Sequence, residues 1–155
     1  MSSRIYVVDT SVFCNLLDIP GRNQRRNEAK AQFNLYNSEG GEFYLPLATV
    51  FETGNHIAHI ENGNLRRKAA GKFADLVRDS LAGQTPFHPL HFWENDEMMS
   101  WLDQFADYAI RECGFGDFTI IKDYEKLCEL QPDIPSAQPI EIWSFDEHLQ
   151  GYLRQ

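Results

Sequence analysis

The sequence has few cysteines and no long apolar segment. Its three cysteines, Cys14, Cys113 and Cys128, are widely spaced and form no CxxC pair, which argues against a disulfide framework or a zinc site. No apolar run approaches the roughly 20 residues that span a bilayer, and the residues after Met1 do not resemble a signal peptide. We therefore expect a cytoplasmic protein with buried thiols and no membrane partner.

The sequence is also poor in positive charge. It contains 14 Lys and Arg residues against 23 Asp and Glu residues, which gives a formal net charge of −9. This balance argues against a protein that coats nucleic acid through a broad positive surface. It does not exclude a nuclease, because a carboxylate cluster that holds a divalent cation contributes much of the negative charge itself, and the cation reverses the local sign.

What is present indicates one α/β domain over residues 1–155, with no internal repeat or low-complexity tract. Short apolar runs alternate with helical patterns, which predicts a Rossmann-like three-layer α/β/α sandwich with a central parallel sheet of four to five strands. Strands are expected at 5–8, 42–45, within 86–92 and at 140–144, and helices at 12–17, 23–38, 48–60, 64–81, 94–113, 117–128 and 147–153.

Two helices carry more detailed predictions. Asn64 is the expected N-cap of the helix that runs to Leu81. The long helix after Glu94 has apolar residues at helical spacing, and these are expected to be its buried face. They are Met99, Leu102, Phe105, Ala106, Ala109, Ile110 and Cys113.

The chain is organised around its first strand, residues 5–8, which ends at Asp9. Open α/β sheets bind ligands at the carboxyl ends of their parallel strands, and Asp9 is expected there. An equally simple interpretation is that Asp9 caps the helix that follows, since Asp is a favoured N-cap residue. The position of the other acidic residues decides between these interpretations.

Four carboxylates take equivalent topological positions. They follow or begin an element at the expected carboxyl edge of the sheet and have apolar neighbours: Asp9, Glu52, Asp117 and Asp146. Like charges gathered there repel one another, and desolvation adds to the cost. A hard divalent cation with oxygen ligands removes that cost, and two such ions can clamp a phosphoryl displacement. The pattern predicts a Mg²⁺ or Mn²⁺ site that hydrolyses a phosphodiester.

Four segments of the chain resemble PIN-domain nucleases, in the order that family has them. They are an apolar strand with Asp and Thr/Ser (5–13), a strand, proline and helix with a glutamate (45–52), a third acidic position (116–121) and a Ser-x-Asp (143–146). The chain departs from the family at Phe118, where a small residue is usual, and in a longer proline-rich loop at 131–138.

The resemblance implies a Mg²⁺- or Mn²⁺-dependent endoribonuclease acting on single-stranded or structured RNA. It also implies the toxin of a toxin–antitoxin pair, with a cognate antitoxin protein and a homodimer as partners. In this hypothesis Asp9, Glu52 and Asp117 hold the ion directly, and Asp146 does so directly or through water. Thr10, Ser11 and Ser144 would orient the carboxylates by hydrogen bonds.

Basic residues provide the candidate RNA contacts. They form two groups: Arg22, Arg25 and Arg26 in the first, and Arg66, Arg67, Lys68 and Lys72 in the second. The alternative is that these are solvated helix faces, and contact with RNA predicts a steep salt dependence of cleavage. His56 and His59 follow Glu52 but do not form an HExxH motif, so we interpret them as solvated or capping residues.

Other function classes fit less well. A HAD-type phosphatase requires a second Asp two residues after the first, where this chain has Ser11, and a response-regulator receiver requires an acidic pair before its first helix. The remaining alternative is a catalytically inactive PIN-like module that binds RNA or protein. Thermal stabilisation by Mn²⁺ separates the active from the inactive alternative.

Overall fold

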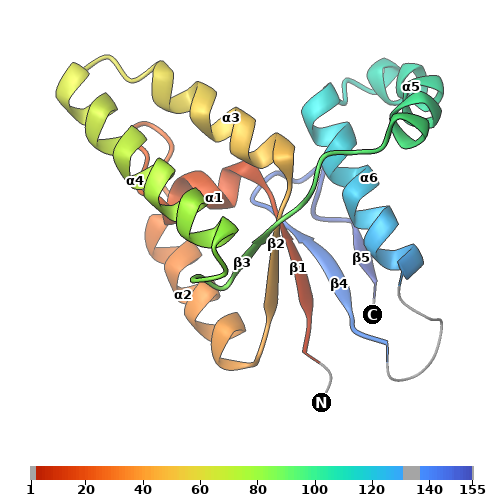
Figure 1. Ribbon diagram of the computed structural model, residues 1–155, viewed down its shortest axis with the longest axis horizontal. Helices are drawn as coiled ribbons and strands as arrows, with labels where there is room; N and C mark the ends of the chain where they lie inside the picture. Colours follow the sequence, from red (N-terminus) through yellow and green to blue (C-terminus); the bar gives the residue numbers. More distant parts are fainter. Residues whose placement is uncertain (1–2, 131–136, 155) are drawn as a thin grey trace.

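The computed structural model describes residues 3–130 and 137–154 (Figure 1). Most of the proline-rich loop predicted at 131–138, namely residues 131–136, lies outside the described residues. Five strands form one sheet in the order β3-β2-β1-β4-β5, of which the first four pair in parallel and the last is antiparallel. Their bounds are β1 Ile5–Val8, β2 Glu42–Leu45, β3 Phe87–Pro89, β4 Ile140–Trp143 and β5 Leu153–Arg154.

Six helices connect and flank these strands in the described part of the chain. They are α1 Thr10–Leu16, α2 Arg26–Ser38, α3 Leu47–Ala58, α4 Gly63–Leu81, α5 Asn95–Ile110 and α6 Phe115–Leu130. The predicted α/β class and parallel sheet are therefore confirmed. Pro89 is tolerated in β3 because this is an edge strand, where one side of the backbone has no ladder to complete.

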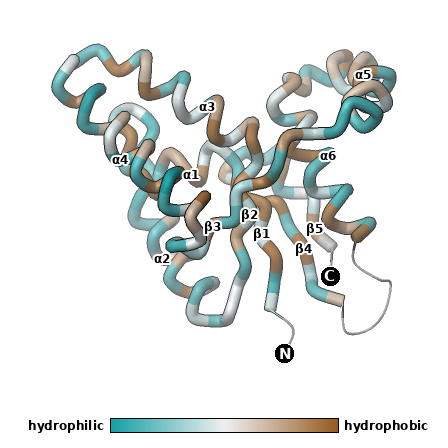
Figure 2. Tube along the Cα trace, viewed as in Figure 1, coloured by the Kyte–Doolittle hydropathy of each residue, from teal (hydrophilic) through white to brown (hydrophobic). Residues whose placement is uncertain are grey.

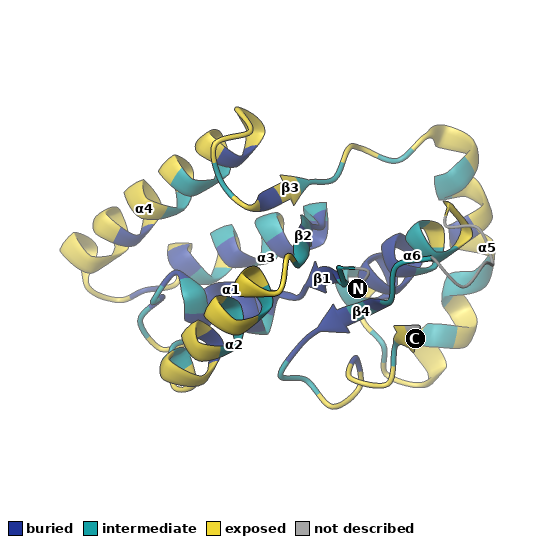
Figure 3. Ribbon diagram, turned by 90° about the horizontal axis from the view of Figure 1, so that it is seen from below, coloured by how far each residue is buried: buried dark blue, intermediate teal, exposed yellow. Residues whose placement is uncertain are grey.

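The core lies on both faces of the sheet, as the alternation of side chains along β1 requires. Ile5 and Val7 face a cluster built with α6, whereas Tyr6 and Val8 face a second cluster that includes residues of α1 and α3. All four of these β1 residues are buried. Figure 2 shows the apolar residues concentrated along the strands, and Figure 3 shows β1 and β4 buried while α4 and α5 are largely exposed.

Two predicted helix features are wrong. The helix expected at 147–153 is instead a series of turns followed by β5, and β5 pairs with β4 through Ile140 and Glu141. Strand pairing supplies backbone hydrogen bonds that a helix of seven residues, too short to be stable alone, would have to make by itself. The N-cap of α4 is Asn62, not Asn64, because the Asn62 Oδ1 accepts from the backbone N–H of Leu65 at 3.0 Å.

The buried face predicted for α5 is wrong for most of its residues, although Phe105 and Cys113 of that set are half-buried. Met99, Leu102 and Ile110 are exposed by 66%, 54% and 81%, and Trp101 is the buried residue of this helix. The reason is that α5 packs on α6 rather than on the sheet, so only a narrow stripe of α5 is covered. That stripe includes Phe105 and Tyr108, whose rings contact Phe118, the residue at which the sequence departs from the PIN pattern.

The thiols are less uniformly buried than expected, since Cys14 is buried while Cys113 and Cys128 are half-buried. Within residues 3–130 and 137–154, every helix is too short or too polar to cross a lipid bilayer.

The arrangement of the helices gives the sheet a distinctive carboxyl edge. Above this edge, α3 and α4 extend to one side while α5 and the start of α6 lie on the other (Figure 1). Asp9 and Asp146 follow the central strands β1 and β4, whereas Glu52 belongs to α3 and Asp117 to α6. The fold thus directs all four elements that carry the predicted acidic residues to one edge.

Candidate functional site

A cavity of about 380 Å³ opens at the carboxyl edge of the sheet, and all four predicted carboxylates line it. Its lining therefore includes residues from the ends of β1 and β4 and from the helices α1, α3 and α6. The lining residues are Asp9, Thr10, Ser11, Cys14, Asn15, Arg22, Gln24, Arg25, Glu52, His56, Asp117, Phe145 and Asp146.

Asp9 caps the helix that follows it and also lies at the carboxyl edge of the sheet, where it lines the cavity. It is the N-cap of α1, and its Oδ2 accepts from the backbone N–H of Ser11 at 3.4 Å. The same oxygen accepts hydrogen bonds from the hydroxyls of Ser11 and Ser144, each at 2.7 Å. Among the described residues, none donates to the other carboxylate oxygen, Oδ1. Asp9 is only 4% exposed, so its orientation is fixed by these bonds while Oδ1 stays available to a ligand.

Three hydroxyl residues were predicted to orient the carboxylates, and two of them do so. Ser11 and Ser144 hydrogen-bond Asp9, as predicted, and also lie within 3.3 Å of each other. Thr10 does not have that role, because its Oγ1 is buried without a hydrogen-bond partner among the described residues. Thr10 is the first residue of α1 and lines the cavity, but its hydroxyl bonds none of the described carboxylates.

Glu52 is brought to the cavity by the way α3 starts. Pro46 ends β2 in an extended conformation and precedes the first turn of α3. The hydroxyl of Thr49 donates to the Val8 carbonyl at 2.8 Å, which fixes this turn against the end of β1. Glu52 follows less than one turn later. Its Oε1 is buried and accepts no hydrogen bond from the described residues. Burial and, secondarily, the charges of Asp117 and Asp9 raise the pKa of Glu52 to about 7.

Asp117 lies in the first turn of α6, after the break at Gly114. Burial raises the pKa of Asp117 to about 6, and the neighbouring charges of Asp9 and Asp146 add to that effect. His148 acts in the opposite direction and lowers this pKa. A buried carboxylate repelled by its neighbours is the electrostatic condition typical of functional sites.

Asp146 completes the set from the connection between β4 and β5. Its backbone N–H donates to the Ser144 hydroxyl at 2.9 Å, and its Oδ1 accepts from the backbone N–H of His148 at 2.9 Å. Ser144 therefore links Asp146 to Asp9 through one hydroxyl group. The Ser-x-Asp spacing in the sequence allows this linkage, because it places the Ser144 hydroxyl next to the backbone N–H of Asp146.

The four carboxylates have the chemistry that a hard divalent cation requires of its ligands. Carboxylate oxygens are the ligands that Mg²⁺ and Mn²⁺ prefer, and a buried Glu52 Oε1 without a partner is an unmet requirement for a proton donor or a cation. In the described part of the chain, however, no three His, Cys, Asp or Glu side chains converge closely enough to hold an ion as they stand. The four carboxylates line one cavity, and charge repulsion between them contributes to the raised pKa values of Glu52 and Asp117. They do not form a coordination shell as they stand.

Gly116 is a site residue that the sequence analysis did not identify as such. A Cβ added at Gly116 would collide with Oε1 of Glu52, so the Glu52 carboxylate packs directly on the Gly116 backbone. The available sequence feature was a glycine immediately before an acidic residue at a helix start. This close approach joins α3 to α6 beside the cavity that Glu52 and Asp117 both line.

If the cavity holds Mn²⁺, Gly116→Ala is expected to displace the Glu52 carboxylate and to weaken Mn²⁺ binding about 10- to 100-fold, as changes around metal ligands commonly do. Gly114→Ala is the matched control, since a Cβ there meets no atom within 4 Å. Titration with Mn²⁺ by calorimetry measures both variants. Equal affinities for the two variants would contradict the importance of this contact.

The two predicted groups of basic residues have different positions. Arg22 and Arg25 line the cavity, and the guanidinium of Arg25 stacks on the Phe145 ring at 3.9 Å. Arg26 instead donates to the carbonyls of Asn15 and Leu16 at the end of α1. The second group is on α4 and contributes nothing to the lining of this cavity. It consists of Arg66, Arg67, Lys68 and Lys72.

Asn15 and Phe145 are further lining residues that sequence reasoning missed. The Asn15 Oδ1 accepts from the backbone N–H of Arg25 at 2.8 Å, which ties the segment before α2 to α1. Phe145 supplies the ring beneath Arg25. No sequence pattern distinguishes Asn15 or Phe145 from ordinary helix and loop residues. Both contact Arg25, which belongs to a different segment of the chain.

The two histidines of α3 differ in their surroundings. His56 lines the cavity, and burial together with the positive charge of Arg22 lowers its pKa. His59 has its Nδ1 2.7 Å from the carbonyl of Asn55, consistent with the predicted capping role. Neither belongs to a group of three potential metal ligands in the described residues.

No protein-family model, curated protein or solved structure matches this chain. A function can therefore be argued only from the residues and the site described above.

Proposed function

We propose that this protein is a Mg²⁺- or Mn²⁺-dependent endoribonuclease that hydrolyses phosphodiester bonds in single-stranded or structured RNA. The observation that carries the proposal is the meeting of Asp9, Glu52, Asp117 and Asp146 in one cavity at the carboxyl edge of the sheet. These are the four positions at which the sequence resembles PIN-domain nucleases. Carboxylates gathered from four separate elements repel one another, and a bound divalent cation offsets that cost.

The residues take distinct roles in this proposal. Asp9, Glu52 and Asp117 would hold the divalent cation directly, and Asp146 directly or through water. Such a cation supplies Lewis acidity at the phosphoryl oxygen and lowers the pKa of water. Ser11 and Ser144 hold the Asp9 carboxylate in one orientation, and Gly116 allows the Glu52 carboxylate to approach α6. Arg22 places positive charge on the cavity wall, where a phosphate would enter. Arg25 lies on the same wall with its guanidinium paired to Glu28 at 2.8 Å, and would exchange part of that pairing for the phosphate.

The test is cleavage of a labelled single-stranded RNA by the purified protein. Cleavage is expected with Mg²⁺ or Mn²⁺, and it should stop when a chelator is added and return when excess cation is restored. Cleavage that persists in the chelator would contradict the metal-dependent assignment. Absence of cleavage under all conditions by a folded protein would refute the nuclease assignment.

Salt dependence should reveal the phosphate contacts. If Arg22 and Arg25 each contact one phosphate, kcat/KM should fall about sevenfold between about 50 and 200 mM salt. Arg22→Gln should flatten this dependence, whereas the charge-matched control Arg78→Gln, at an exposed position on α4, should leave it unchanged. A flat response of the unmodified protein would contradict the role of both arginines.

One observation favours a second candidate, a catalytically inactive module that binds RNA or protein. It is the lack of convergence among three potential ligands in the described residues. The inactive module predicts no thermal stabilisation by Mn²⁺, while the nuclease predicts a clear increase in Tm. The further proposals of a toxin role, a cognate antitoxin and a homodimer rest on the PIN resemblance.

A further inference from the structure

A second cavity, of about 180 Å³, adjoins the carboxylate cavity and shares one residue with it. The shared residue is Asp117, which lines both cavities. A group that binds in the second cavity therefore lies next to whatever contacts the Asp117 carboxylate. The lining of the second cavity includes Tyr108, Arg111, Cys113, His148 and Tyr152.

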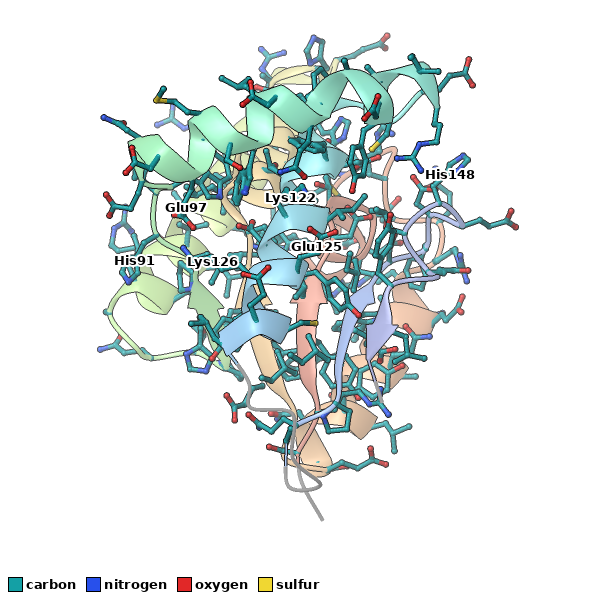
Figure 4. All side chains as sticks on the ribbon, turned by 90° about the vertical axis from the view of Figure 1, so that its right-hand side faces the viewer. His91, Glu97, Lys122, Glu125, Lys126 and His148 are labelled. Carbon is teal, nitrogen blue, oxygen red and sulfur yellow. The ribbon has the colours of Figure 1, made fainter. Side chains whose placement is uncertain are left out.

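Two stretches distant in the sequence build this second cavity, one from the end of α5 into α6 and the other between β4 and β5. Tyr108 is in the last turns of α5, Arg111 and Cys113 are in the turn before α6, and His148 and Tyr152 are in the β4–β5 connection. Figure 4 shows His148 on that connection, below the end of α5. The connection is anchored to the sheet, since the N–H of Ile142 donates to the Tyr152 carbonyl at 3.0 Å.

Aromatic rings form two sides of the cavity and are held in place by packing. The Tyr108 ring contacts the buried ring of Phe118, with centroids 4.8 Å apart. The Tyr152 ring contacts that of Tyr124 at 5.8 Å. Rings fixed in this way offer apolar surfaces without a large loss of side-chain entropy on binding, which favours a flat aromatic ligand.

Positive charge lies beside these rings. The guanidinium of Arg111 lies 4.7 Å from the centroid of the Tyr108 ring, and its Nε donates to the Asp107 carbonyl at 3.2 Å. An arginine arranged on an aromatic ring presents a planar cation on which a nucleobase can stack. His148 adds a second nitrogen donor or acceptor to the rim. The carboxylates of Glu112 and Asp117 also line the cavity, so it is not a site for a bare anion.

We propose that the second cavity binds the nucleobase of a nucleotide adjacent to the phosphodiester that is cut. The inference rests on the proposed function and extends it, since it assigns Arg111 and the two tyrosines to base binding and makes the substrate a strand with at least one unpaired base. A base stacked on the Arg111 guanidinium, which itself lies over the Tyr108 ring, and flanked by Tyr152 would position its phosphate beside Asp117. Stacking of this kind is tolerant of sequence, because every base has a π-face.

The experiment is a base-removal scan of a labelled hexaribonucleotide. Each base in turn is replaced by an abasic site, and binding is followed by fluorescence anisotropy in the Asp9→Asn variant, so that cleavage does not interfere, at an Mn²⁺ concentration high enough to saturate this variant. One position should weaken binding about fivefold to a hundredfold. Arg111→Gln, introduced into the same protein, should weaken binding of the intact strand and reduce the additional loss at that one position to less than about twofold.

Three further variants separate stacking from charge and folding. Arg78→Gln removes an equal charge at an exposed position on α4 and should leave the scan unchanged. Tyr108→Phe keeps the ring and should also preserve the pattern, whereas Tyr108→Leu should abolish the position-specific loss while its melting curve remains cooperative.

The outcomes distinguish this inference from the nuclease proposal, because the scan measures binding alone. A position-specific loss with no metal-dependent cleavage by the unmodified protein would support the base site and refute the nuclease. Equal losses at every position, an unchanged scan in Arg111→Gln, or no binding of the intact strand by folded protein would each overturn the base site.

Discussion

Asp117→Asn is expected to lower the kcat/KM of Mn²⁺-dependent RNA cleavage by about a hundredfold or more. Asp117 lines both cavities, and the negative charges of Asp9 and Asp146 lie near it. Replacing it with a neutral side chain of the same shape removes an anionic ligand without removing volume. The first turn of α6 keeps its hydrogen bonds, since the N–H of Phe118 donates to the Gly114 carbonyl.

The matched control is Asp103→Asn, at an exposed position on α5 outside both cavities. This control should cleave RNA at the rate of the unmodified protein. Melting curves recorded in a chelator show whether either variant is unfolded. If Asp117→Asn is folded and cleaves RNA as well as Asp103→Asn, the assignment of Asp117 is wrong.

Glu52→Gln is expected to stabilise the protein at pH 8 in a chelator while abolishing its activity. The folded-state pKa of Glu52, about 7, lies above the ordinary value of 4.5. The folded protein therefore binds this proton more tightly than the unfolded chain does. The stability linked to that proton is fully present below about pH 4.5 and is lost as the pH rises through about 7. Gln remains neutral and avoids this loss.

The expected gain in the free energy of unfolding at pH 8 is about 1–2 kcal/mol, because water screens part of the charge at this half-buried side chain. This corresponds to an increase in Tm of about 2–8 °C. At pH 4.5 the difference should vanish. Glu61→Gln, in the exposed connection between α3 and α4, is the control and should change Tm little at either pH. A lower Tm for Glu52→Gln at pH 8 would contradict the electrostatic account.

Local patterns were sufficient to predict the sheet and the meeting of the acidic residues. The run from Ile5 to Val8 is apolar on both faces, which is characteristic of a central parallel strand, and its burial confirms this. Parallel strands share one carboxyl edge, so acidic residues at their ends had to approach one another. The approximate position of Asp9 and Asp146 thus followed from topology alone.

Features that depend on tertiary partners could not be predicted. Helical spacing identified an apolar stripe on α5, but only packing decides which helix face is covered, and Met99 and Ile110 proved exposed. The segment 147–153 has a short helical pattern, yet pairing with β4 determines its conformation.

The details of the site depend on contacts between residues distant in sequence. The close approach of Gly116 to Glu52 and the stacking of Arg25 on Phe145 are examples. Single-sequence patterns report local periodicity and say nothing about such pairs. The same reason explains why the cavity formed by Tyr108, Arg111 and Tyr152 was not anticipated.

Calorimetric titration of the protein with Mn²⁺ shows directly whether the four carboxylates form one divalent-cation site. At about pH 6.5, in two buffers of different ionisation enthalpy, we expect saturable binding with a net release of protons, because Glu52 and Asp117 are partly protonated there. The Asp9→Asn variant should bind far more weakly. An absence of saturable heat, or equal binding by Asp9→Asn, would contradict the claim.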